Sequence, residues 1–106
     1  MGLRLYPFDA FEWTPGSHPL ERKKSAPSDA LAVLEFAPGF SDPAWCLRGH
    51  QGYVLEGRLG FEIDNARHEI GPGQAFAIDP GAPHRAFTAG DAPVRFFVVS
   101  SSVLEA

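Results

Sequence analysis

The chain has one cysteine, Cys46, and no apolar run near the roughly 20 residues of a membrane-spanning helix. A single cysteine cannot form an internal disulfide, which favours a reducing, cytoplasmic setting. The net charge of −4 leaves no basic patch for nucleic acid. The opening MGLRLYPFDAFEW has acidic residues and proline and lacks an apolar core of signal-peptide length. We therefore expect neither secretion nor a nucleic-acid or membrane partner.

The composition favours β-structure over helix. The chain has 106 residues, of which 44% are hydrophobic and 12% aromatic, enough for one modest core. Its 10 prolines and 11 glycines argue against long helices and for many turns. This composition predicts a single all-β domain spanning residues 1–106.

Short apolar or alternating segments, separated by Gly, Pro, Asp and Asn, recur along most of the chain. They predict strands near 30–36, 51–57, 58–64, 67–71, 75–78, 84–88 and 94–100. Strands at this spacing are typical of a sandwich or barrel. Residues 1–28 show no regular pattern and are expected to form an irregular N-terminal segment, in which the charged run 21–24 is a solvated loop or an exposed edge.

The stretch from His50 to His84 carries a resemblance to a known family. Tyr53–Gly57 resembles the strand-and-turn ending of the first cupin motif, and Gly73–His84 resembles most of the second. The resemblance spans roughly residues 30–100. It implies a jelly-roll barrel, the double-stranded β-helix of cupins, with metal ligands in the barrel mouth. It also implies a homodimer, because cupins commonly pair through their strands.

The first motif departs from the family pattern at its metal ligands. His50 stands where the family has a metal-binding glutamate, Cys46 where it has the second histidine, and Ala44 where it has the first. In the second motif, Asp79 replaces a proline and Thr88 an asparagine. The loop after Gly39 is about one residue short, so a shift of one position would turn Trp45, rather than Cys46, toward the site.

The resemblance thus implies a metal set of Cys46, His50 and His84. Two imidazoles and a thiolate suit zinc best, with iron, nickel or manganese as alternatives. Three protein ligands would leave a position open for water or substrate. The alternative is structural: a free cysteine is often a small buried hydrophobe, and either histidine could serve only as a hydrogen-bonding group. His68 is expected to be structural.

Other residues are candidates for a substrate pocket. Arg48 shares strand parity with Cys46 and His50, so it could bind a substrate carboxylate, or it could be an exposed loop arginine. Trp45, Phe61 and Phe87 could form an apolar lining, or they could belong to the core.

Three functions are compatible with this sequence. The first is a small metal-dependent enzyme of dioxygenase, isomerase or lyase type that acts on a small molecule. The second is a non-catalytic module that binds or senses a small ligand. The third is a metal-free barrel that associates with a partner. Fold alone does not decide between them.

Overall fold

The computed structural model describes residues 2–100, so Met1 and residues 101–106 of the expected domain lie outside it. It confirms the all-β class. The strands are β1 (Thr14–Pro15), β2 (Glu21–Ala26), β3 (Leu31–Phe36), β4 (His50–Glu56), β5 (Arg58–Ile63), β6 (Ala66–Ile70), β7 (Ala75–Ile78), β8 (His84–Ala89) and β9 (Val94–Ser100). Two short 3-10 helices, η1 (Phe8–Ala10) and η2 (Pro27–Asp29), precede β3. Within residues 2–100, no helix has the length and apolar character needed to cross a membrane.

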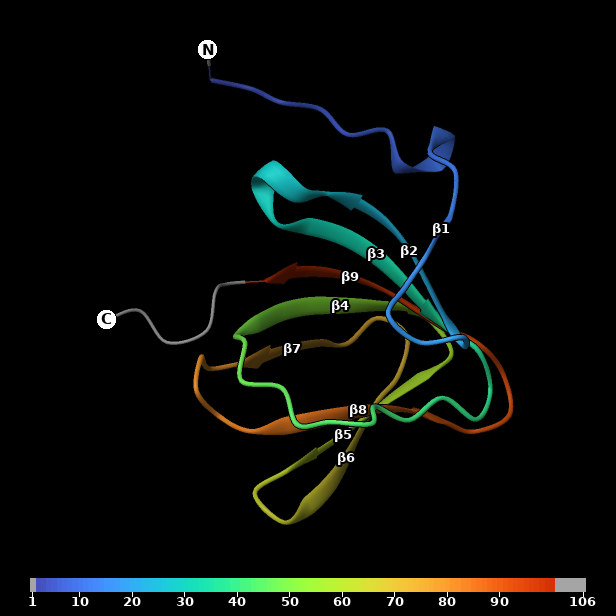
Figure 1. Ribbon diagram of the computed structural model, residues 1–106, viewed down its shortest axis with the longest axis vertical. Helices are drawn as coiled ribbons and strands as arrows, with labels where there is room; N and C mark the ends of the chain where they lie inside the picture. The colour runs from blue at the N-terminus through green and yellow to red at the C-terminus, as the bar shows by residue number, and fades with distance from the viewer. Residues whose placement is uncertain (1, 101–106) are drawn as a thin grey trace.

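The strands form two antiparallel sheets that face each other as a jelly-roll barrel (Figure 1). The large sheet has six strands in the order β1-β2-β3-β9-β4-β7, and the small sheet has three in the order β6-β5-β8. Strands distant in sequence are therefore neighbours, as where β9 lies between β3 and β4. This order encloses the core between the sheets and places the start of β8 opposite the start of β4.

The predicted strands are present with small differences at their ends, but the prediction for residues 1–28 is wrong over residues 21–26. These residues form β2, which pairs with β3 along its whole length. These residues are mostly charged and show no apolar alternation, so the sequence pattern did not predict the strand. Arg22 and Lys24 instead lie over the Trp13 ring, at 4.3 and 4.8 Å from its centroid.

Two turns show why the local sequence produces hairpins here. Asp64 and Asn65 both have positive φ, the conformation that a two-residue hairpin requires and that Asn and Asp tolerate best. Gly57 joins β4 to β5 with φ of 76°. Both turns therefore lie where the sequence predicted them.

The core fills the space between the sheets. Val54, Leu59 and Val94 are fully buried, and the Phe36 and Phe40 rings stack with centroids 3.9 Å apart. Since alternate residues of a strand point to opposite faces, these side chains define the inner face of each sheet. The side chains of His50 and His84 also lie on the inner side, where they line an internal cavity.

Candidate metal centre

Backbone pairing brings Cys46 and His84 directly opposite each other. The Cys46 N–H donates to the His84 carbonyl at 2.8 Å, and the His84 N–H donates to the Cys46 carbonyl at 3.0 Å. Residues paired in this way project their side chains to the same face. A residue before β4 and the first residue of β8 therefore share one wall of the barrel interior.

The segment before Cys46 bulges outward. The Asp42 N–H donates to the Ala86 carbonyl, and the Ala86 N–H donates to Asp42 Oδ2, both at 2.9 Å. Between this pair and the Cys46–His84 pair, residues 43–45 have no ladder partner on β8 among the described bonds, and the Asp42 carboxylate supplies the missing acceptor. Trp45 is 54% exposed as a result. Cys46, and not Trp45, faces the interior.

His50 completes a group of three donors. It begins β4 between β7 and β9, and its Nε2 lies 3.7 Å from Cys46 Sγ. The His50 and His84 rings are nearly perpendicular, with centroids 5.1 Å apart. One ligand atom from each of Cys46, His50 and His84 lies within 4.8 Å of the others. The three residues named from the sequence therefore converge.

Hydrogen bonds orient both imidazoles. His84 Nδ1 lies 2.9 Å from the Ala82 carbonyl, which can only accept, so Nδ1 carries the proton and Nε2 keeps its lone pair. His50 Nδ1 lies 2.9 Å from the Ser100 hydroxyl, and its Nε2 is the atom beside the thiol. In metal-binding histidines, a hydrogen bond from the ring nitrogen that does not contact the metal, here Nδ1, holds the ring in place.

Burial keeps His50 neutral. Desolvation, followed by the charges of His84 and Arg48, lowers its pKa from 6.5 to about 4. A protonated imidazole cannot bind a metal ion, so this lowered pKa leaves a competent ligand at neutral pH.

The same pKa predicts the acid sensitivity of the metal-free protein. Below about pH 6.5 the unfolded chain takes up a proton that folded His50 accepts only near pH 4. The stability from neutral His50 is therefore full above pH 6.5 and is lost as pH falls to 4, on the order of 2 kcal/mol after allowance for solvent screening. Urea unfolding across this range should show the loss, and His50→Gln should flatten the curve. Parallel curves for the two proteins would contradict the assignment.

The donor set fits zinc. In a tetrahedral zinc site, Zn–N bonds of about 2.0–2.1 Å and Zn–S bonds of about 2.3 Å place two ligand atoms roughly 3.3–3.6 Å apart. Cys46 Sγ and His50 Nε2 are already 3.7 Å apart, and all three donors lie within 4.8 Å of one another, so side-chain movements of about 1 Å would close them around an ion. Two neutral imidazole nitrogens and one sulfur are also the donors that zinc prefers.

A cavity of about 140 Å³ adjoins the three donors inside the barrel. Side chains from both sheets line it, most of them apolar. The lining consists of Glu21, Leu34, Phe36, Asp42, Cys46, His50, Phe61, Phe76, His84, Ala86, Phe96 and Val98. A ligand beside the donors would thus contact mainly hydrocarbon and aromatic rings.

The residues proposed from sequence for a pocket divide between the two sides of the barrel wall. Phe61 lines the cavity, with its ring centroid 6.0 Å from that of His84. Phe87 does not, which corrects the expectation, because it lies on the opposite face of β8 against Gly60 and beneath the Arg67 guanidinium. Trp45 also lies outside, stacked with Arg85 at 4.4 Å. Arg48 is exposed and influences His50 only through its charge.

Sequence reasoning missed Glu21, Asp42 and Ser100. Ser100 contacts His50 only because β9 lies beside β4. Glu21 reaches the cavity only because β2 joins the large sheet. No local motif marks these residues, and strand pairing would have been the one signal.

The chain has recognisable relatives. The family model described as "Cupin domain" matches residues 32–100. No curated protein sequence matches the chain.

Solved structures with the same fold include three similar proteins. The polyketide cyclase RemF from Streptomyces resistomycificus has 28% identity and a TM-score of 0.73, with 94% of this chain and 79% of RemF covered. KdgF from Halomonas sp. has 21% identity and a TM-score of 0.69, covering 89% and 91%. A sugar phosphate isomerase of the cupin superfamily from Silicibacter pomeroyi has 18% identity and a TM-score of 0.74, covering 94% and 76%. The last two likenesses concern the fold alone.

Proposed function

Since this chain belongs to the cupin family, we propose that it is a metal-binding cupin protein that holds one divalent ion through Cys46, His50 and His84. Zinc is the first choice. The observation that carries the proposal is the convergence of these three donors beside an internal cavity.

The chain's own residues prepare this site in three ways. The Ala82 carbonyl and the Ser100 hydroxyl orient the rings of His84 and His50. Burial keeps His50 unprotonated. The apolar lining excludes water from a bound molecule and strengthens electrostatic interactions within the cavity.

We propose that the ligand is a small molecule bound in this cavity, and that the reaction is of isomerase or lyase type. An ion held by Cys46, His50 and His84 would supply a Lewis acid for a carbonyl or hydroxyl oxygen of the ligand. The similarity to a polyketide cyclase supports this choice, as does the lack of the full histidine set that dioxygenase chemistry at iron would need. A module that binds the same ligand without turnover is the alternative, and a turnover assay on small phenols, keto acids and sugars separates the two.

Protection of the Cys46 thiol by zinc tests the proposal. Cys46 is partly exposed, so a thiol reagent should modify it in the metal-free protein. Bound zinc should slow this modification at least about tenfold, because the thiolate is then coordinated. Chelator should restore the rate. An equal rate with and without stoichiometric zinc would overturn the ligand assignment.

We also propose a reducing, cytoplasmic setting, because the one cysteine is not in a disulfide and its thiol must stay reduced to bind a metal ion.

We further propose that the protein is a homodimer through the outer face of the large sheet. Tyr53 and Leu55 flank the fully buried Val54 on β4, and remain 46% and 45% exposed. Tyr53 pairs with Phe97 of β9, which extends the apolar surface. Light scattering should give the mass of two chains, and Tyr53→Glu should give one. His68→Glu, at an exposed position on β6, should remain dimeric, and a monomeric wild type would refute this proposal.

A further inference from the structure

An ion at the candidate metal centre would leave few groups in the internal cavity able to accept a proton. It would occupy the lone pairs of Cys46, His50 and His84, and the second ring nitrogen of each histidine already has a hydrogen-bond partner. Apart from these three residues, the cavity lining consists of apolar side chains and two carboxylates, Glu21 and Asp42. A proton acceptor for a molecule in this cavity must therefore be one of these two.

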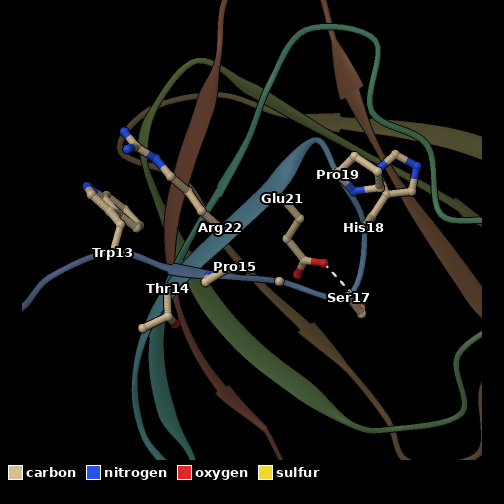
Figure 2. Close-up of a pocket in the computed structure, with 9 residues that line it drawn as sticks. Trp13, Thr14, Pro15, Ser17, His18, Pro19, Glu21 and Arg22 are labelled. Carbon is tan, nitrogen blue, oxygen red and sulfur yellow. Dashed lines mark hydrogen bonds between the residues drawn. The ribbon is translucent and has the colours of Figure 1, made fainter.

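Glu21 lies too far from the metal centre for this role. Through β3 it aligns with Val94, the first residue of β9, whereas His50 pairs with the last residue of that strand. These two levels are six residues apart, which is about 20 Å along a strand. Figure 2 shows the Glu21 carboxylate in a surface groove formed by residues 13–22, where the Ser17 hydroxyl donates to its Oε1 at 3.2 Å. The Glu21 carboxylate is therefore engaged in the groove, remote from the donors.

Asp42 lies close to the donors. Its Oδ2 accepts the Ala86 N–H and its own N–H donates to the Ala86 carbonyl, both at 2.9 Å, so the two residues lie opposite each other. Ala86 follows His84 by two residues on β8, which is about 7 Å along a strand, and both side chains are buried and line the cavity. Asp42 thus lies one turn of the strand's alternation away from the pair formed by Cys46 and His84.

The two carboxylate oxygens of Asp42 have different surroundings. Oδ2 is held by the Ala86 N–H, which fixes the orientation of the carboxylate. Oδ1 forms no hydrogen bond or ion pair with residues 2–100 and is accessible to solvent. A small ligand in the cavity can therefore reach Oδ1, and a general base needs such a position within hydrogen-bond reach of the proton that it removes.

From this arrangement we propose that Asp42 is the catalytic base: its Oδ1 removes a proton from the carbon next to a carbonyl group of the ligand. The inference rests on the proposed function, in which the carbonyl oxygen faces Cys46, His50 and His84. The electron pair of the broken C–H bond forms a C=C bond, and the π pair of the carbonyl group moves onto its oxygen to give an enolate. Return of the proton to a different atom of the ligand completes an isomerisation, whereas departure of a leaving group with its electron pair from the next carbon completes a lyase reaction.

The cavity limits the ligand to about the size of one six-membered ring. Its volume of about 140 Å³ is close to the roughly 150 Å³ of an apolar protein cavity that holds one benzene molecule. The substrate class is therefore a compact ketone or aldehyde. Cyclohexanone is a probe of this size, with one carbonyl oxygen and with hydrogens on both adjoining carbons.

Exchange of these hydrogens for deuterium in D₂O tests the proposal. Zinc-loaded wild-type protein should catalyse the exchange, measured as loss of the corresponding proton NMR signal. Asp42→Asn should slow it at least about 100-fold, the lower end of the usual contribution of general acid–base catalysis. Because the amide oxygen can still accept the Ala86 N–H, the variant should fold, keep wild-type zinc content and bind cyclohexanone within about twofold of wild type. Glu62→Gln, which removes a carboxylate outside the cavity beside Arg85, is the control and should exchange at the wild-type rate.

A second readout needs no metal ion. The Ala86 amide is bonded to Asp42, so its NMR signal should shift when cyclohexanone binds to the metal-free protein. Binding that leaves this signal in place, or exchange by Asp42→Asn at the wild-type rate, would overturn the assignment of Asp42. Zinc-loaded wild-type protein that binds no cyclohexanone, or binds it without exchange, would overturn the substrate class and leave the metal centre standing. If wild-type protein binds no zinc, the proposed function fails, and the Ala86 signal of the metal-free protein still decides whether a ligand lies against Asp42.

Discussion

His84→Ala is expected to lower zinc affinity by at least about 100-fold, since the loss of a residue that merely orients a ligand already costs about 10- to 100-fold. His84 is 2% exposed, and its ring is held by the Ala82 carbonyl with Nε2 left free. Removal of this imidazole would leave one nitrogen and one sulfur, and two ligands bind zinc far more weakly than three. Zinc content after purification without added metal, followed by titration of chelator-treated protein, measures the effect.

His68→Ala is the matched control for this prediction. His68 is exposed on β6, an edge strand of the small sheet. It should take no part in binding the ion held by Cys46, His50 and His84. The variant should retain wild-type zinc content. Because the loss of a buried imidazole also leaves the Ala82 carbonyl without its donor, circular dichroism must show that His84→Ala is folded. A folded His84→Ala protein with unchanged zinc content would end the case for this metal centre.

Gly57→Ala is expected to destabilise the protein by about 3 kcal/mol or more, the largest stability effect that we predict for a surface turn. Gly57 has φ of 76°, which costs a residue with a side chain about 1–2 kcal/mol. A Cβ at this position would also collide with the Pro93 carbonyl oxygen and lie 2.8 Å from Val94 Cα. Both are backbone atoms, and Val94 is fully buried, so neither can move aside without disturbing the core. Urea unfolding measures the change as a lower midpoint at an unchanged m-value.

Gly39→Ala separates the cost of the collision from the cost of positive φ. Gly39 has φ of 87°, but a Cβ there would have no atom within 4 Å. Its replacement should therefore cost only about 1 kcal/mol. If the two variants lost equal stability, the packing of the Gly57 turn against residues 93 and 94, at the start of β9, would contribute nothing to stability.

Sequence alone predicted the strands and turns correctly where they depend on residues adjacent in the chain. The alternation through Tyr53, Leu55 and Leu59 predicted strands, and Gly57 and Asp64–Asn65 predicted the turns between them. The charged residues of β2 were misread because their strand is stabilised by pairing with β3 and by the Trp13 ring, neither of which local pattern reveals.

The site shows the same division. The spacing of the second motif led to His84, and distance from Gly57 led to Cys46 and His50. Sequence left open whether Cys46 or Trp45 faces inward. The loop after Gly39 is about one residue shorter than in the family pattern, so the alignment of residues 43–47 with the first motif can shift by one position. The bulge at residues 43–45 decides this through the bonds between Asp42 and Ala86.

By itself, the sequence determined the all-β class and most of the strands and turns, because these follow from side-chain alternation and from backbone preferences at Gly, Pro, Asp and Asn. The resemblance to the cupin motifs named Cys46, His50 and His84 as the candidate ligands. The tertiary structure alone decided that the donors converge, that Phe87 and Trp45 lie outside the cavity, and that Glu21 lies within it. The reason is register: the pairing of strands far apart in sequence sets which side chains meet, and a shift of one residue would turn each of them to the other face.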